Sequence, residues 1–314
     1  MLGRISFDAW MPFIGVIVLI VAGSFFFPQI LSAEYLTQQL QIAAVLGLLA
    51  TGATIVILLG HFDLSVPWVL TGAAILSTAM VGSGDPILSV LAVPAALLFG
   101  ALIGVVNGIG VAILRIPSMV WTLAVNSMLL GVAVLNTGGF NPKGESSQLM
   151  VTMASGDLLG LPVSFLIWVT ISLALTYFLI RTPFGRYLRS IGFNEKATFL
   201  SGASTPSVVF AAFSIAGMCS ALGGVMLAGY ANQAYQSMGD PFLLPTIAAV
   251  VIGGTSILGG RGGLFGTIGG ALFITLLTSI LSVMQIGDAW RNIIFGVIIL
   301  VMLLFQTLRK GAAP

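Results

Sequence analysis

Side chains that could act as nucleophiles, general bases or metal ligands are few in this chain. Its 314 residues include one histidine, one cysteine and nine acidic residues. A Ser-His-Asp relay would have to combine His61 with Asp63, and side chains two positions apart do not face each other on a helix. His61 also lacks the second histidine of a His-Glu-x-x-His zinc motif. These residues therefore offer neither a catalytic relay nor a metal site.

Three further kinds of chemistry are disfavoured by the sequence. No Gly-x-x-x-x-Gly-Lys-Ser/Thr segment is present, so the chain itself has no Walker-type ATP site. An intramembrane protease needs paired aspartates, or a serine with a histidine, deep in the bilayer, whereas we expect every Asp and Glu here in a loop. Cys219 lies in an apolar run, where a cysteine is usually a small buried hydrophobe. We therefore expect no enzyme activity, no metal and no cofactor.

The composition places the chain in a membrane. Hydrophobic residues make up 58% of the sequence and charged residues only 6%, against about 25% charged in an ordinary soluble domain. The mean hydropathy of +1.13 points the same way. Eleven basic and nine acidic side chains cannot coat a soluble protein of this length. Membrane lipid must therefore be the solvent for most of the surface, and a net charge of +2 suggests no nucleic-acid partner.

Charged residues divide the sequence into ten long uncharged stretches, each able to hold the roughly 20 apolar residues of a transmembrane helix. The predicted fold class is all-α, a polytopic membrane protein with about ten transmembrane helices and a short cytoplasmic helix in a single domain, 1–314. The first apolar run is too long for a cleaved signal peptide. The predicted spans are 11–30, 39–60, 65–82, 86–113, 118–136, 163–180, 207–229, 242–258, 264–284 and 291–308.

Lys and Arg set the expected orientation, because cytoplasmic loops carry an excess of them. With ten spans and a cytoplasmic N-terminus, only Lys143 and Arg291 fall outside. Both termini are therefore expected in the cytoplasm. The basic residues expected on that side are Arg4, Arg115, Arg181, Arg186, Arg189, Lys196, Arg261, Arg309 and Lys310.

Glycines recur every four residues at two places. This spacing puts the glycines of each series on one helix face, where another backbone can approach closely. We expect these faces to pack inside the protein rather than between subunits. The two series are Gly100, Gly104 and Gly108, and Gly262, Gly266 and Gly270.

The hydrophilic segment 181–203 contains the signals of a short helix at 194–202. Asn194 can cap a helix that begins at Glu195, and Gly202 can end it. Ala197 and the apolar residues after it would give this helix a ridge suited to a groove on a soluble partner. A solvated loop that merely satisfies the positive-inside rule explains the same residues, and the local pattern does not decide between the two.

Three segments resemble the ribose-type ABC importer permeases. Residues 185–203 resemble that family's Gly-Arg…Ile-Gly-Gly-Asn-Glu-x-Ala-x-x-x-Ser-Gly-Ile pattern, and 60–66 resemble its Gly-Gly-Ile-Asp-Leu-Ser-Val. Residues 247–267 resemble its Ile-Ala-Ala-Val-Val-Leu-Gly-Gly-Thr-Ser-Leu-x-Gly-Gly-x-Gly stretch. The match spans about 36–308 in the family's order, and the Asp-Leu-Ser form separates the chain from the branched-chain amino-acid permeases, which share the fold.

Some positions depart from the family's pattern. Phe193 replaces a glycine in the first of these segments, and Pro67 replaces the glycine that follows Val66. Leu243 and Pro245 stand where acidic residues are common. The fold and the transport class tolerate these departures, but the identity of a particular sugar cannot be carried over.

The resemblance implies a permease subunit of an importer in the bacterial inner membrane. Two permeases, either two copies or two related chains, would form the pore. A cytoplasmic ABC ATPase subunit would bind the ATP, in agreement with the missing phosphate loop, and an extracytoplasmic solute-binding protein would deliver the solute. The residues implied to dock with the ATPase as a coupling helix are Gly192, Asn194, Glu195, Ala197, Thr198, Phe199, Leu200, Ser201 and Gly202.

Two other functions remain open. A secondary transporter commonly needs an ionisable residue inside the membrane, and none is expected in the middle of a span here. A permease of the same family for a nucleoside or a signalling furanose fits the sequence as well as a sugar permease does.

Candidate side chains along a solute path are few. A sugar would be passed by weak contacts with amides and hydroxyls. Asn107 and Asn126 lie within predicted spans, and Thr122 lies one turn before Asn126 on the same helix face. Interhelical hydrogen bonds that fix the packing are the alternative role for all three, and the one we favour.

Overall fold

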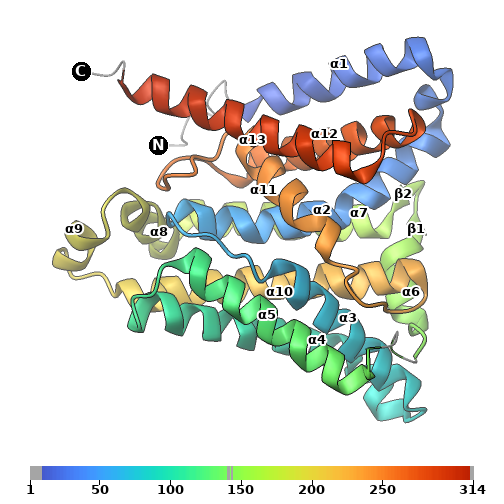
Figure 1. The fold of residues 1–314 in the computed structure, drawn as a ribbon, viewed down its shortest axis with the longest axis horizontal. Helices are drawn as coiled ribbons and strands as arrows, with labels where there is room; N and C mark the ends of the chain where they lie inside the picture. Colours follow the sequence, from blue (N-terminus) through green and yellow to red (C-terminus); the bar gives the residue numbers. More distant parts are fainter. Residues whose placement is uncertain (1–8, 140–141, 143, 312–314) are drawn as a thin grey trace.

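Long apolar runs bounded by prolines, glycines and charges fold into helices that cross the whole protein (Figure 1). The computed structural model describes residues 9–139, 142 and 144–311, so the predicted basic positions Arg4 and Lys143 lie outside the described residues. The elements are α1 (Met11–Phe26), η2 (Pro28–Leu31), α2 (Ala33–Leu58), α3 (Val66–Gly82), α4 (Pro86–Gly108), η3 (Ile109–Ile113), α5 (Ser118–Thr137), α6 (Gln148–Ser155), β1 (Asp157–Leu158), β2 (Leu161–Pro162), α7 (Val163–Arg181), α8 (Pro183–Phe193), α9 (Glu195–Leu200), α10 (Thr205–Ala231), η4 (Asp240–Phe242), α11 (Leu243–Ile252), α12 (Leu264–Val283) and α13 (Asp288–Gly311).

Length and composition allow many of these helices to cross a bilayer. Within the described part of the chain, six helices have both the length and the apolar character of a span, and three shorter helices are apolar. The six are Ala33–Leu58, Pro86–Ile113, Ser118–Thr137, Val163–Arg181, Thr205–Ala231 and Leu264–Val283. The shorter ones are Met11–Phe26, Val66–Gly82 and Asp240–Ile252. Apart from the small antiparallel hairpin of β1 and β2, the protein is an all-α polytopic membrane protein.

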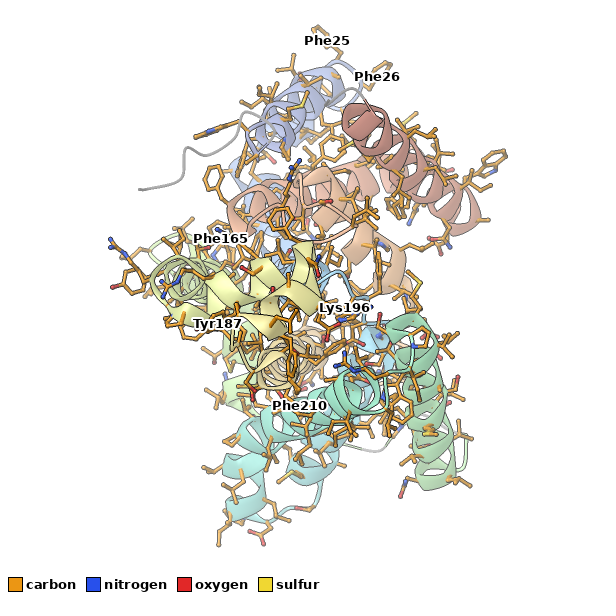
Figure 2. The ribbon with its side chains drawn as sticks, turned by 90° about the vertical axis from the view of Figure 1, so that its left-hand side faces the viewer. Phe25, Phe26, Phe165, Tyr187, Lys196 and Phe210 are labelled. Carbon is orange, nitrogen blue, oxygen red and sulfur yellow. The ribbon has the colours of Figure 1, made fainter. Side chains whose placement is uncertain are left out.

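The two ends of the helix bundle differ in character. Figure 1 places α8 and α9 at one end, and α6 with β1 and β2 at the other. Figure 2 looks onto the end that carries α8 and α9, from which Tyr187 and Lys196 face the viewer. We call it the basic end, because its elements carry Arg115, Arg181, Arg186, Arg189, Lys196 and Arg261.

Two spans are interrupted by segments that are not helical. The segment 59–65 runs from the end of α2 at the basic end toward the middle of the bundle, where α3 begins (Figure 1). The predicted span 242–258 is wrong beyond Ile252, where α11 ends. From there the chain continues as turns to the basic end before α12 begins. Gly254, Gly259 and Gly260 have φ values of 80°, 83° and 73°, which only glycine adopts freely, so the helix cannot continue through them.

The glycine faces pack inside the protein, as their spacing predicts. A Cβ on Gly100 would overlap the carbonyl oxygen of Gly217, and one on Gly104 would overlap that of Phe213. α4 and α10 therefore touch through their backbones. In the second series, Gly270 meets the carbonyl oxygen of Ala249 in α11 and Gly266 meets that of Gly253, the residue after α11, whereas Gly262 lies in the turn before α12.

The core lies around α2, which is the most enclosed of the long helices. Trp168 of α7 is fully buried against Gly47, where any side chain would overlap its ring. Its indole N–H donates to the hydroxyl of Thr51 at 3.2 Å, and that hydroxyl is 2.9 Å from the hydroxyl of Ser172. Every polar group in this contact has a partner, so α2 and α7 are held in one register.

Candidate functional site

The short helix predicted at 194–202 is α9. The side chain of Asn194 accepts a hydrogen bond from the backbone N–H of Ala197 at 3.0 Å, which caps the first turn. Gly202 follows the last turn with a φ of 88°, the left-handed backbone expected just after a helix end. Both capping residues lie outside the helix proper, which spans Glu195–Leu200.

The exposed side of α9 is apolar. Phe199 is 60% exposed and Leu200 is 83% exposed, and Ala197 between them and the cap is also open to solvent. Asn194, Ser201 and Gly202 are exposed as well. A two-turn helix with two large uncovered apolar side chains has the surface expected for a protein contact.

Thr198 differs from the other residues proposed for docking. It is only 6% exposed, and its hydroxyl donates to the carbonyl oxygen of Asn194 at 2.9 Å. It therefore faces the body of the protein and supports α9 from beneath. Helical spacing alone does not say which face of α9 is covered, and the structure places Thr198 on the covered one.

The three segments that carry the family resemblance meet directly beneath α9. A Cβ on Gly259 would lie 2.8 Å from the nitrogen of Gly60 and 3.0 Å from the carbonyl oxygen of Gly192. Gly192 in turn packs its Cα against the carbonyl oxygen of Leu58, the last residue of α2. The N–H of Gly260 donates to that same oxygen at 2.8 Å. Three glycines thus let α8, the end of α2 and the 253–263 segment touch through their backbones.

An ion pair joins α9 to the connection between α4 and α5. The guanidinium of Arg115 contacts the carboxylate of Glu195. Arg115 adopts a left-handed φ of 57°, a backbone conformation that costs a residue with a side chain about 1–2 kcal/mol. No sequence pattern pairs these two residues, because 79 positions lie between them.

The segment 59–65 is held on one side by α5. The N–H of Phe62 donates to the hydroxyl of Ser118 at 3.1 Å, and the N–H of Leu64 donates to the hydroxyl of Thr122 at 2.9 Å. Ser118 and Thr122 lie one turn apart on α5, so one helix face satisfies the backbone N–H groups of two residues that lie outside any helix.

The same segment is held on its other side by α4. One carboxylate oxygen of Asp63 accepts from the N–H and the hydroxyl of Ser65 at 2.9 and 2.5 Å. The amide of Asn107 donates to the hydroxyl of Ser65 at 2.8 Å and to Asp63 at 3.4 Å. Asp63 lies in the non-helical segment between α2 and α3, in a hydrogen-bonded cluster inside the bundle that local sequence did not indicate.

The three solute-path candidates are therefore only partly brought together. Asn107 and Thr122 flank the segment 62–65 from opposite sides, and both are fully buried. Their hydrogen bonds fix that segment in place, which is the packing role. Asn126 lies one turn beyond Thr122, and its side-chain amide oxygen accepts no hydrogen bond from the described residues. The side-chain amide oxygen of Asn107 likewise has no hydrogen-bond partner among the described residues, so both asparagines retain a polar atom for a solute.

The described residues contain no group of three or more His, Cys, Asp and Glu side chains that could hold a metal ion. The cluster of Asp63, Ser65 and Asn107 instead combines a carboxylate, a hydroxyl and an amide. These groups donate and accept hydrogen bonds, here to one another.

Comparison with known proteins identifies the family. The model of the family described as branched-chain amino acid transport system / permease component matches residues 35–303. The chain is 34% identical to the ribose import permease protein RbsC of Bacillus subtilis, over 99% of this chain and 97% of that protein. It is 34% identical to the Haemophilus influenzae protein of the same name, over 93% and 91% of the two chains.

A third relative has a different solute in its name. The autoinducer 2 import system permease protein LsrC of Escherichia coli is 35% identical, over 93% of this chain and 85% of that protein. No solved structure matches the chain. The family match and the relatives both extend over nearly the whole length of the chain. The three segments that resemble the family's motifs are also in contact with one another, through Gly60, Gly192 and Gly259. The chain therefore belongs to the ABC importer permease family, in its ribose-type branch, a family of transport subunits rather than of enzymes.

Proposed function

We propose that this protein passes a sugar-like solute from an extracytoplasmic binding protein to the cytoplasm, with the energy supplied by a separate ATPase subunit. The observation that carries the proposal is the match along nearly the whole chain to relatives named as ribose and autoinducer 2 import permeases. The solute is accordingly ribose, a related sugar or a signalling furanose. A neutral solute of this kind agrees with the polar, uncharged side chains of Asn107, Thr122 and Asn126.

We further propose ten spans with both termini in the cytoplasm of a bacterial cell, across the inner membrane. Six long and three shorter apolar helices, together with the 24 residues of α13, supply ten. The positive-inside rule then assigns the basic end to the cytoplasm, because six basic residues lie on its elements. α9 is on that side as well, where an ATPase would meet it.

In this mechanism α9 is the coupling helix. Phe199 and Leu200 enter a groove on the ATPase, while Thr198 and the ion pair of Glu195 with Arg115 attach the helix to the permease. ATP-driven closure of two ATPase subunits moves α9, and the bundle rocks between inward-open and outward-open states. Two permeases, identical or related, form the pore.

A secondary transporter is the alternative class of function. It would need an ionisable group inside the bundle, and Asp63 is the residue that could supply one. The carboxylate of Asp63 accepts hydrogen bonds from Ser65. Transport coupled to protonation or ion binding at Asp63 would proceed without an ATPase. Solute uptake by the reconstituted chain alone, in a proton or sodium gradient, would therefore show secondary transport and contradict the proposed ATP-driven import.

The test is a change at Ala197. The purified chain alone should hydrolyse no ATP, whereas the complex with its ATPase should be stimulated by the solute-loaded binding protein. Ala197→Arg should leave expression and membrane insertion intact but abolish both stimulation and uptake, because a long charged side chain prevents close docking of α9. The matched control Ala197→Ser keeps a small side chain and should retain both activities. Normal uptake by Ala197→Arg would show that α9 is not the docking element.

A further inference from the structure

The outer face of α7 ends in an arginine at the level where the bilayer surface begins. Leu173, Tyr177 and Arg181 recur every four residues and so lie on one helix face. Leu173 is 56% exposed and Tyr177 is 67% exposed. In a membrane-spanning helix, a face of this kind contacts lipid, and the last residue of α7, Arg181, stands directly above it.

Arg181 has an aromatic neighbour but no acidic partner among the described residues. Its guanidinium lies 5.9 Å from the centroid of the Tyr177 ring. The ion pairs found in the described part of the chain belong to Arg115 and Arg291 instead. Arg186 and Arg189 follow on α8, again without an ion-pair partner there. Arg181, Arg186 and Arg189 therefore place three positive charges within nine residues of sequence, none of them in an ion pair among the described residues.

A groove lies beside these charges. It has a volume of about 290 Å³ and separates α8 from the start of α10. The ring of Phe184 on its wall is 5.4 Å from that of Phe178 on α7, so the groove adjoins the end of the lipid-facing helix. Figure 2 shows Tyr187 at this end of the molecule. The lining residues are Pro183, Phe184, Tyr187, Ser204, Ser207 and Val208.

We propose that this corner binds an anionic phospholipid, with the phosphate on Arg181 and the glycerol region in the groove. A guanidinium is the preferred partner of phosphate oxygens, since it can present two parallel N–H donors. The hydroxyls of Ser204 and Ser207, which are 2.9 Å apart, offer further hydrogen bonds. Phe184 and Val208 offer apolar contact to the upper acyl chains, which continue along Leu173 and Tyr177.

Lipid is favoured over a protein partner because the site continues a membrane-facing surface. α7 brings its exposed apolar face up to Arg181 without a break, and a soluble protein could not cover that face inside a bilayer. Basic pockets between helices at a membrane surface are typical sites for acidic headgroups. The inference needs only the membrane location of α7, and not the direction of the chain or the transported solute.

The test uses the purified full-length permease, without ATPase or nucleotide, in nanodiscs of phosphatidylcholine with or without phosphatidylglycerol. Native mass spectrometry counts the phosphatidylglycerol molecules retained after gentle release. Arg181→Gln should reduce the retained phosphatidylglycerol about fivefold, as expected when one arginine worth about 1 kcal/mol near an anionic membrane surface is removed. The matched control is Arg261→Gln, since Arg261 at the same end also lies over an aromatic ring, that of Phe193 at 5.8 Å.

The outcomes separate lipid binding from other roles. Unchanged melting of Arg181→Gln in pure phosphatidylcholine shows that the variant is folded, and Arg181→Lys should retain an intermediate amount of phosphatidylglycerol. Equal losses in Arg181→Gln and Arg261→Gln, or no loss in either, would overturn the site. In a second measurement with the ATPase subunit added, weakened ATPase binding by Arg181→Gln together with unchanged lipid retention would assign the corner to the ATPase instead. Because the lipid measurement itself contains no solute, nucleotide or partner, its failure leaves the proposed transport function untouched.

Discussion

Arg115 and Glu195 form the direct side-chain contact between α9 and the connection that leads into α5. Their side chains are 60% and 35% exposed, so the attraction is screened by water and contributes only about 0.2–1 kcal/mol to folding. At the start of α5, the hydroxyls of Ser118 and Thr122 hold the segment 62–65. The pair therefore connects α9, through the start of α5, with the segment that carries the buried polar cluster, and its expected role is alignment rather than stability.

Charge reversal tests that role at the residue scale. Arg115→Glu should shift the unfolding midpoint by no more than about 3 °C, given the small energy of an exposed pair. The same variant should lose much of the ATPase stimulation by loaded binding protein, because α9 is no longer aligned with α5. The double variant with Glu195→Arg restores the pair in the opposite sense and should recover stimulation. If the double variant were as impaired as the single one, each residue would act alone and the alignment role would be wrong.

At the scale of elements, α4 and α10 pack with their backbones in direct contact. Gly100 and Gly104 each face a carbonyl oxygen of α10, and Gly217 of α10 faces α4 in return. Lipid tails are as apolar as leucine side chains, so helices in a membrane associate mainly through such close packing. The spacing of four keeps the contact on one face of α4 through two turns.

A matched pair of alanine substitutions tests this contact. In Gly104→Ala the new Cβ would overlap the carbonyl oxygen of Phe213, so the helices must separate, and overpacking of this kind costs about 1–3 kcal/mol. Gly131→Ala on α5 adds the same methyl group where no atom lies within 4 Å. We expect a lower melting temperature and a lower folded yield in detergent for Gly104→Ala only. Equal melting curves for the two variants would show that α4 and α10 have room to move apart.

For the whole molecule, the distribution of basic residues predicts one orientation in the membrane. Lys196 is exposed on α9 at the basic end, and Ser155 is exposed at the end of α6 on the opposite side (Figure 1). Cys219 is 5% exposed and can be replaced by serine to leave a background without thiols. The chain therefore allows a clean comparison between its two ends.

Thiol labelling in intact cells checks this orientation. In the Cys219→Ser background, Ser155→Cys should react with an impermeant reagent added from outside. Lys196→Cys should react only after the membrane is opened, because the positive-inside rule retains the basic end in the cytoplasm. A cysteine at 147 serves as a second external position. Labelling of position 196 from outside would invert the entire topology and remove α9 from the reach of any cytoplasmic ATPase.

Much about this protein depended on neighbouring residues alone and could be predicted from sequence. Apolar stretches of sufficient length enter a membrane whatever their packing, because the cost of exposing them to water dominates. The positions of helix ends also depend on nearby residues. Asn194 caps α9 and Gly202 follows it with a positive φ, and both roles depend on a few adjacent residues. The family resemblance is also carried by contiguous motifs, so it needed no structure.

Only the tertiary structure decided which of these residues meet. The ion pair of Arg115 with Glu195, the burial of Thr198 and the contact of Gly60 with Gly259 join segments far apart in the chain. The end of α11 at Ile252 was missed, since the run to residue 258 is apolar enough for a longer helix. Beyond it, Gly259 adopts a positive φ and packs against the backbones of Gly60 and Gly192. Hydropathy and capping are properties of short segments, whereas these outcomes depend on packing between distant segments, which no local pattern encodes.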